Sequence, residues 1–293
     1  MSNDSAERNK AEAIFNLACD KKDPALFFEA AERGARLKPP DYISAKISYF
    51  QSGKHALEAE SKGQSIDIDP LVPLWRGARL ADPLCLFTIG EYERNIELAH
   101  ACFNLANCFD HIRGEAGINP VFRLQELEKE MDVTAILRAE ELAIETWRDI
   151  DKTTFFERPG RYSEAQLDNI LATEADGTYD DLIRKLSVYT NTSLVGFPRC
   201  SGRAYELLRL GVEKEYIECI AALGIYTKQG LGVIRKAERE AFELLERASR
   251  AGLPNAQATL AELYTSGEDT DQNLVKAYKL INAALKTEWR SEL

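Results

Sequence analysis

The sequence predicts an all-α protein in which antiparallel helix pairs stack into an α-solenoid, with no substantial sheet. Three observations favour this fold class. Apolar residues recur at helical spacing, as in the stripe formed by Ala11, Ile14, Phe15 and Ala18. Prolines and glycines stand where such stretches begin and end. The last third of the 293-residue chain also repeats itself at a fixed interval.

The apolar spacing predicts about thirteen helices, and several of them have recognisable ends. Pro24, after Asp23, fits the first position of a helix, where its missing N–H has no helical partner to lose. Asp132 fits an N-cap, whose side chain accepts from the first helical N–H groups. Before the repeats we expect helices over 5–20, 24–34, 43–53, 71–80, 84–89, 91–112, 164–174 and 179–190, and two within 121–148.

Charge is distributed unevenly along the chain. The whole sequence has a net charge of −11, from 48 acids and 37 bases. Residues 115–181 hold 17 acids and 7 bases, whereas 201–293 hold 14 and 13. Binding to nucleic acid needs a Lys/Arg footprint, so we expect no nucleic-acid partner. There is no run of about eighteen apolar residues and no apolar segment near Met1, so we expect no membrane span and a cytoplasmic location.

The six cysteines do not have the spacing of a disulfide scaffold. No CxxC pair occurs, and six thiols are sparse for a chain of this length. We therefore expect reduced and mostly buried thiols.

Residues from about 201 onward repeat with a period near 37 residues. The stretch 223–230, which begins with Leu-Gly and ends in Gly, recurs as 260–267, which begins with Leu-Ala and ends in Gly. A second signature, an alanine followed by an aromatic residue and then by leucine two positions later, begins at Ala204, Ala241 and Ala277. Two short helices cannot bury their apolar faces alone, so neighbouring units must stack. Glycines at 230, 252 and 267 are expected at helix ends, in left-handed turns.

These residues resemble the SEL-one-like repeat, a slightly longer relative of the tetratricopeptide repeat. The resemblance covers about 200–290 and is best over 256–267, which reads Ala-Gln-x-x-Leu-x-x-x-Tyr-x-x-Gly. Asp269 departs from the family pattern at its second glycine. A weaker echo over 28–53 leaves open a degenerate unit near the N-terminus. The resemblance implies a tetratricopeptide-like solenoid that binds proteins without catalysis, and it carries over no functional residue.

Three regions follow from these features. We expect a helical N-terminal region over 1–114, an acidic helical region with a linker over 115–200, and the repeats over 201–293. The segment 191–202, which contains Thr, Ser, Gly and Pro, is the clearest linker.

One group of potential metal ligands stands out. Glu97 and His100 are spaced i, i+3, with Cys102, Cys108 and His111 nearby. A two-iron bundle site needs two such motifs, and this sequence has one. The two histidines would lie about 16 Å apart along one helix, although zinc ligands must all lie about 2 Å from one ion. We predict no metal site and no cofactor.

The catalytic motifs of common enzyme classes are missing. Gly230-Leu-Gly232 lacks the third glycine of a dinucleotide-binding loop, since Arg235 occupies that position, and the preceding segment is helical. The motifs GxSxG and HExxH are absent, and the chain has three histidines. We predict that the protein is not an enzyme. An active site within 54–200 remains the rival hypothesis.

The acidic stretch 115–181 is the candidate docking surface for a basic protein. Its alternative interpretation is a set of solvated helix faces. Aromatic residues among the acids would supply apolar anchors. The candidate partner-binding residues are Glu126, Glu128, Glu130, Phe155, Phe156, Asp176, Asp180 and Asp181. We expect an adaptor or binding scaffold. One specific alternative is a bacterial immunity protein that neutralises a cognate toxin, for which a basic nuclease would suit the charge.

Overall fold

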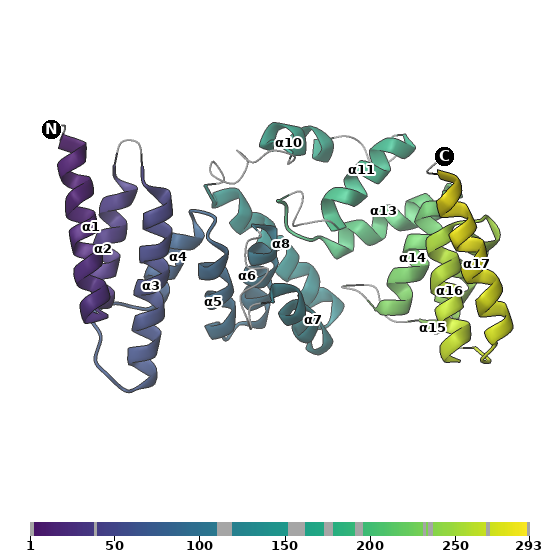
Figure 1. Cartoon of the computed structure of the whole chain (residues 1–293), viewed down its shortest axis with the longest axis horizontal. Coiled ribbons are helices and arrows are strands. Elements are labelled where there is room, and N and C mark those ends of the chain that lie inside the picture. The colour runs from purple at the N-terminus through teal and green to yellow at the C-terminus, as the bar shows by residue number, and fades with distance from the viewer. Residues whose placement is uncertain are drawn as a thin grey trace. The chain divides into compact units, whose positions relative to one another are not determined.

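The structure is a computed structural model that describes residues 3–37, 40–109, 119–151, 162–172, 178–190, 196–230, 233, 237–267 and 270–291. Within these ranges it contains fifteen helices and no strand, which confirms the all-α prediction (Figure 1). The helices are α1 (Asn3–Lys21), α2 (Pro24–Ala35), α3 (Tyr42–Ser61), α4 (Leu71–Ala78), α5 (Pro83–Tyr92), α6 (Ile96–Cys108), α7 (Pro120–Glu130), α8 (Val133–Asp149), α10 (Glu164–Ala172), α11 (Tyr179–Thr190), α13 (Ser201–Glu213), α14 (Ile217–Gln229), α15 (Glu238–Arg250), α16 (Pro254–Ser266) and α17 (Leu274–Ser291).

The chain forms two compact units. The first consists of Met1–Met131, Arg138–Ser163 and Thr192–Pro198, and the second of Asp132–Leu137, Glu164–Asn191 and Arg199–Leu293. In the first unit each helix from α1 to α7 packs against the next one in sequence. In the second unit the same holds from α13 to α17 (Figure 1). Sequential packing of this kind is the arrangement of a solenoid, in which each element contacts only its neighbours.

Several predicted helix ends are confirmed. Pro24 is in the first turn of α2, and the carboxylate of Asp23 accepts from Ala25 N at 2.9 Å. The carboxylate of Asp132 accepts from Ala135 N at 2.8 Å at the start of α8. The predicted left-handed glycines have φ values of +65° at residue 230, +91° at 252 and +70° at 267. These residues end their helices as capping physics requires.

The predicted helix over 91–112 is wrong. The structure ends α5 at Tyr92 and begins α6 at Ile96. The side-chain oxygen of Asn95 accepts from Glu97 N at 2.9 Å and from Leu98 N at 3.1 Å. A local N-cap therefore divides a segment whose apolar spacing alone favours one helix.

A common junction connects successive helices at four places in the chain. At each one, a residue with positive φ stands two positions before the first residue of the next helix. These residues are Lys22, Ala81, Glu215 and Gly252, with φ values of +51°, +58°, +61° and +91°. The residue that follows each of them donates its N–H to a carbonyl five positions back, in the pairs Asp23–Ala18, Asp82–Gly77, Tyr216–Gly211 and Leu253–Ala248. This 6→1 bond with a left-handed residue is the Schellman geometry that closes a helix end.

The helices α3, α6, α13, α15 and α17 also share a pattern. Small or compact residues seven positions apart face the interior in five helices. The pairs are Ala45 and Ser52, Ala99 and Ala106, Ala204 and Gly211, Ala241 and Ala248, and Ala277 and Ala284. A separation of seven residues keeps both members of a pair on one helix face. The segment 24–61, which carries the N-terminal echo, therefore has the junction and the buried positions of a repeat unit.

In three of the four junctions, the acceptor residue is buried against the next helix. Gly77 faces Cys85 and Gly211 faces Cys219, and a β carbon at either glycine would overlap the cysteine sulfur. In the third of these junctions, alanines at 248 and 256 occupy both positions, fully buried. The two residues of each pair are eight positions apart, so the three pairs occupy equivalent places. Two pairs combine a glycine with a larger cysteine and the third combines two alanines, which are two ways of filling the same close contact.

None of the six cysteines, all of which lie in the described residues, forms a disulfide, and most of them are buried as predicted. Five of the six are buried, and Cys19 is exposed. One cluster of buried residues in the repeats includes Ile220, Leu245, Leu260 and Tyr264. These residues come from three successive helices, so no single pair could have formed this core alone.

Candidate protein-binding surfaces

Acidic residues of α7 do not all lie on the same face of the helix. Glu130 is exposed, and Glu126 accepts from Arg123 Nη1 at 2.7 Å at the surface. Glu128 is buried, with 7% of its surface exposed. On a helix, a step of two residues turns the side chain by about 200°. Acids at 126, 128 and 130 therefore alternate between surface and interior, and the assignment of Glu128 to a docking surface is wrong.

The buried carboxylate of Glu128 contacts the imidazole of His100. Glu128 Oε1 lies 3.1 Å from His100 Nε2, and the histidine is fully buried in α6. Polar groups removed from water are stable only when they are hydrogen-bonded. The contact therefore joins α7 to α6 and contributes to the fold.

Substitution of Glu128 with alanine is expected to lower the free energy of unfolding by about 2 kcal/mol, because it leaves the buried imidazole without this contact. Glu130→Ala is the matched control and should change that free energy by less than about 0.5 kcal/mol. Urea denaturation followed by circular dichroism measures both values. Equal effects of the two substitutions would contradict the assignment of Glu128 to the interior.

An exposed acidic line runs along α8. Glu141, Glu145 and Asp149 are all exposed and lie four residues apart, hence on one side of the helix. Sequence reasoning assigned them to the acidic stretch but did not select them. The signal was available, since a spacing of four places three carboxylates on one face. This line belongs to the first unit.

The acids at the start of α11 belong to the second unit. Asp180 is exposed, and Asp181 caps the helix with Thr178: its carboxylate accepts from Thr178 Oγ1 at 2.7 Å, and its own N–H donates back to that oxygen. The hydrogen bond from the Thr178 side chain holds the pKa of Asp181 below its ordinary value. The Asp181 side chain is therefore anionic near neutral pH.

The aromatic residues and the last acid proposed for the docking surface differ in where they lie. Phe155, Phe156 and Asp176 lie outside the residues that the structure describes. Among the other aromatic residues of the acidic stretch, Phe122 is 53% exposed. Trp147 is buried, and its indole Nε1 donates to Gly196 O at 2.8 Å. Trp147 is therefore a core residue and not an anchor for a partner.

The potential metal ligands are engaged elsewhere. Glu97 Oε1 pairs with Arg138 Nη2 at 2.6 Å, and His100 contacts Glu128. His111 lies outside the described part of the chain. Within that part, no three His, Cys, Asp or Glu side chains are placed to hold one ion.

Three of the buried thiols have the raised pKa values of unreactive cysteines. Burial raises the pKa of Cys85 and of Cys102, and the nearby Asp82 and Glu93 carboxylates raise these two values further. Burial also raises the pKa of Cys219 to about 11. A reactive cysteine needs a lowered pKa, so these three thiols have the character of structural residues.

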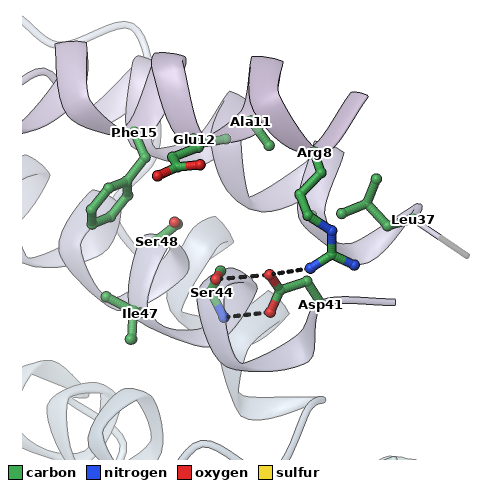
Figure 2. Close-up of a pocket in the computed structure, with 11 residues that line it drawn as sticks. Arg8, Ala11, Glu12, Phe15, Leu37, Asp41, Ser44, Ile47 and Ser48 are labelled. Atoms are coloured by element: carbon green, nitrogen blue, oxygen red, sulfur yellow. Dashed lines mark hydrogen bonds and ion pairs between the residues drawn. The ribbon is translucent and has the colours of Figure 1, made fainter. Parts of the chain in front are cut away.

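A pocket of about 350 Å³ opens between α1, α2 and α3 (Figure 2). Phe15, Leu37 and Ile47 supply apolar lining, and Arg8 Nη1 lies 3.3 Å from Asp41 Oδ2 at one side. The ion pair satisfies both charges. Glu12, Ser44 and Ser48 add polar groups to the lining, so the pocket is not purely apolar.

The stacked helix pairs, their common junction and their recurring small residues define a helical repeat protein. The family model for the Sel1 repeat matches residues 79–111, 217–253 and 254–286. The chain thus contains three Sel1 repeats, and the resemblance found in the sequence is confirmed. Sel1 repeats generally mediate protein–protein interaction, and their fold is typically a scaffold without catalytic activity.

Two solved structures are similar to this chain. One is a Sel1 repeat protein from Oxalobacter formigenes, at 16% identity over 96% of this chain and 99% of that one, with a TM-score of 0.38. The other is c5321, a protective antigen present in uropathogenic Escherichia coli strains, which displays an SLR fold. It has 15% identity over 94% of this chain and 64% of that one, with a TM-score of 0.32. No curated protein matches this chain.

The repeat at 79–111 was missed by sequence reasoning. It comprises α5 and α6, and Ile89-Gly90 corresponds to Leu223-Gly224 of a later unit. Ala99 and Ala106 supply the same seven-residue spacing as the later units. That spacing was the available signal, since both alanines lie in the helix predicted over 91–112.

Among the described residues, no helix combines the length and the apolarity that a membrane span requires.

Proposed function

We propose that the protein is a non-enzymatic binding scaffold that docks a basic protein partner on the exposed acids of residues 115–181. The observation that carries the proposal is the line of Glu141, Glu145 and Asp149 on α8, in a stretch with 17 acids and 7 bases. A surface of one sign attracts an oppositely charged protein and accelerates the encounter. Sel1 repeats supply a framework of the class that binds proteins.

Other acids extend the proposed surface within each unit. Glu126 and Glu130 belong to the first unit, whereas Asp180 and Asp181 belong to the second. Phe155, Phe156 and Asp176 remain candidates on sequence grounds, as apolar anchors and a further charge. A docking surface needs such anchors because exposed ion pairs by themselves contribute little affinity.

The test neutralises the α8 line in the triple variant Glu141→Gln, Glu145→Gln and Asp149→Asn. The probe is the product of the gene adjacent to the one encoding this chain, titrated against the intact protein by surface plasmon resonance at low salt. We expect the association rate to fall about 10-fold, because steering by the acidic line is lost. Raising the salt should reduce the difference between parent and variant.

A matched control removes the same charge from another place. Glu206, Glu213 and Glu240 are exposed in the repeats, and their replacement by glutamine should change the rate less than about 2-fold. Equal losses in both triple variants would show that net charge acts without a specific surface. An unchanged rate in the α8 variant would refute the electrostatic docking itself.

A more specific candidate is an immunity protein that neutralises a cognate toxin. The acidic surface favours this candidate, since a nuclease that binds a phosphate backbone carries a basic surface. Addition of the purified protein to the adjacent gene product should then suppress nuclease activity at equimolar ratio. Binding without suppression would favour an adaptor instead.

A further inference from the structure

Helix α17 carries an exposed apolar stripe. Leu274, Tyr278, Ile281 and Leu285 are 61%, 69%, 46% and 48% exposed, and Val275 beside them is 66% exposed. Their spacing of four, three and four residues places the first four on one face of the helix. Contiguous exposed apolar surface of this kind marks an interaction site more often than scattered single residues do.

The preceding repeat shows how the equivalent face is covered there. Ala277 and Ala284 of α17 correspond to Ala241 and Ala248 of α15, an offset of 36 residues. Tyr278 thus takes the place of Phe242, whose ring packs edge-on against Tyr264 of α16 with 5.8 Å between ring centres. Ile281 takes the place of Leu245, which is fully buried.

On α15, the face equivalent to the exposed stripe of α17 is therefore covered by another helix, α16. The α15 residues at the two equivalent places contribute to the core shared with α16. The shape of the stripe on α17 accordingly fits one helix, packed as α16 packs against α15.

The charges beside the stripe are basic. Lys279 and Lys286 are exposed, and the side chains of α17 described in the structure include no acid; the exposed Asp271 lies just before the helix. The nearby acid of α16, Glu262, pairs with Lys228 at 2.9 Å. Two α17 helices packed on each other would bring lysines toward lysines, so the charge disfavours a second copy.

We propose that α17 docks an amphipathic helix of a partner protein whose apolar face is flanked by carboxylates. The apolar stripe supplies the buried contact, and Lys279 and Lys286 select acids at the edge. This surface prefers an acidic partner, whereas the surface on α8 prefers a basic one. The two interactions are therefore independent and have opposite charge requirements.

The probe is a stapled helical peptide with the sequence of α16, Pro254–Ser266. One version has glutamate at three of the exposed positions, Asn255, Ala258 and Thr265, and the other has lysine at the same three. Binding to the full chain is measured by fluorescence polarisation. We expect the acidic peptide to bind at least about 10-fold more tightly than the basic one, because of the two lysines beside the stripe.

Variants of the protein separate the apolar and the charged contributions. Ile281→Ser and Tyr278→Ser should each weaken binding of the acidic peptide about 10-fold, through lost apolar contact. Ile43→Ser is the matched control, since Ile43 is 74% exposed in the first unit, and it should leave binding unchanged. Lys279→Glu with Lys286→Glu should reverse the preference in favour of the basic peptide. Circular dichroism confirms that each variant is folded.

Three results would overturn the proposal. The first is the absence of binding by either peptide, and the second is equal binding of both. The third is a concentration-dependent dimer in sedimentation velocity that Ile281→Ser dissociates, which would assign the stripe to a second copy. None of these results depends on the α8 surface, so the proposed function is tested separately.

Discussion

Trp147→Ala is expected to lower the free energy of unfolding by about 4 kcal/mol. Removal of a buried tryptophan loses its apolar contacts and leaves a cavity, which costs about 3–5 kcal/mol in protein cores. The ring lies edge-on to Phe197, with 5.0 Å between ring centres, and is 5% exposed. The same substitution leaves Gly196 O without its donor from the indole. Urea denaturation followed by circular dichroism measures the loss.

A second substitution at this position separates packing from hydrogen bonding. Trp147→Phe retains an aromatic ring but loses the indole N–H, so a smaller loss of about 1–2 kcal/mol is expected. Phe122→Ala serves as the exposed aromatic control and should cost less than about 0.5 kcal/mol. A loss below about 1 kcal/mol for Trp147→Ala would mean that the ring does not belong to the core.

Gly211→Ala is expected to lower the free energy of unfolding by about 3 kcal/mol. The added methyl group would overlap the sulfur of Cys219 and lie 2.6 Å from its β carbon, and both residues are buried in the contact between α13 and α14. Forcing an extra methyl group into a close-packed contact costs about 1–3 kcal/mol, and backbone atoms cannot move away cheaply at a helix crossing.

Rescue by a second substitution is the sharper measurement. The corresponding places in the next unit hold Ala248 and Ala256, fully buried in the same kind of contact. Gly211→Ala combined with Cys219→Ala recreates that pair and should recover most of the lost stability. A double-mutant cycle by urea denaturation gives the interaction free energy. Additive losses would show that the two residues do not share one contact.

The C-terminal repeats were predictable because their signals are local and repeated. Leucine, glycine and alanine recur at fixed intervals there, and each interval reflects one close contact between helices. The N-terminal half uses the same contacts with other residues. Lys22 and Ala81 take the left-handed place that glycine holds at 252. A pattern read from glycine therefore misses junctions that the backbone forms with other side chains.

The candidate site was less predictable for a different reason. Counting acids along the sequence finds a charged stretch but does not separate the faces of its helices. Glu128 lies inside at the contact with His100, whereas Glu141 and Glu145 lie outside on α8. Only the pairing of helices decides which face is covered. Trp147 illustrates the same limit, since its burial depends on Gly196 and Phe197, far along the chain.

The common junction also has a kinetic consequence. In a linear array, one contact between neighbours can open while the others stay closed, so stability varies along the chain. The N–H groups of Asp23, Asp82, Tyr216 and Leu253 each close an equivalent 6→1 bond. Once corrected for the intrinsic exchange rate of each local sequence, their hydrogen–deuterium exchange rates therefore report the opening of four equivalent junctions. Differences among the corrected rates would rank the contacts between neighbouring helices within each compact unit and show which of these contacts opens first.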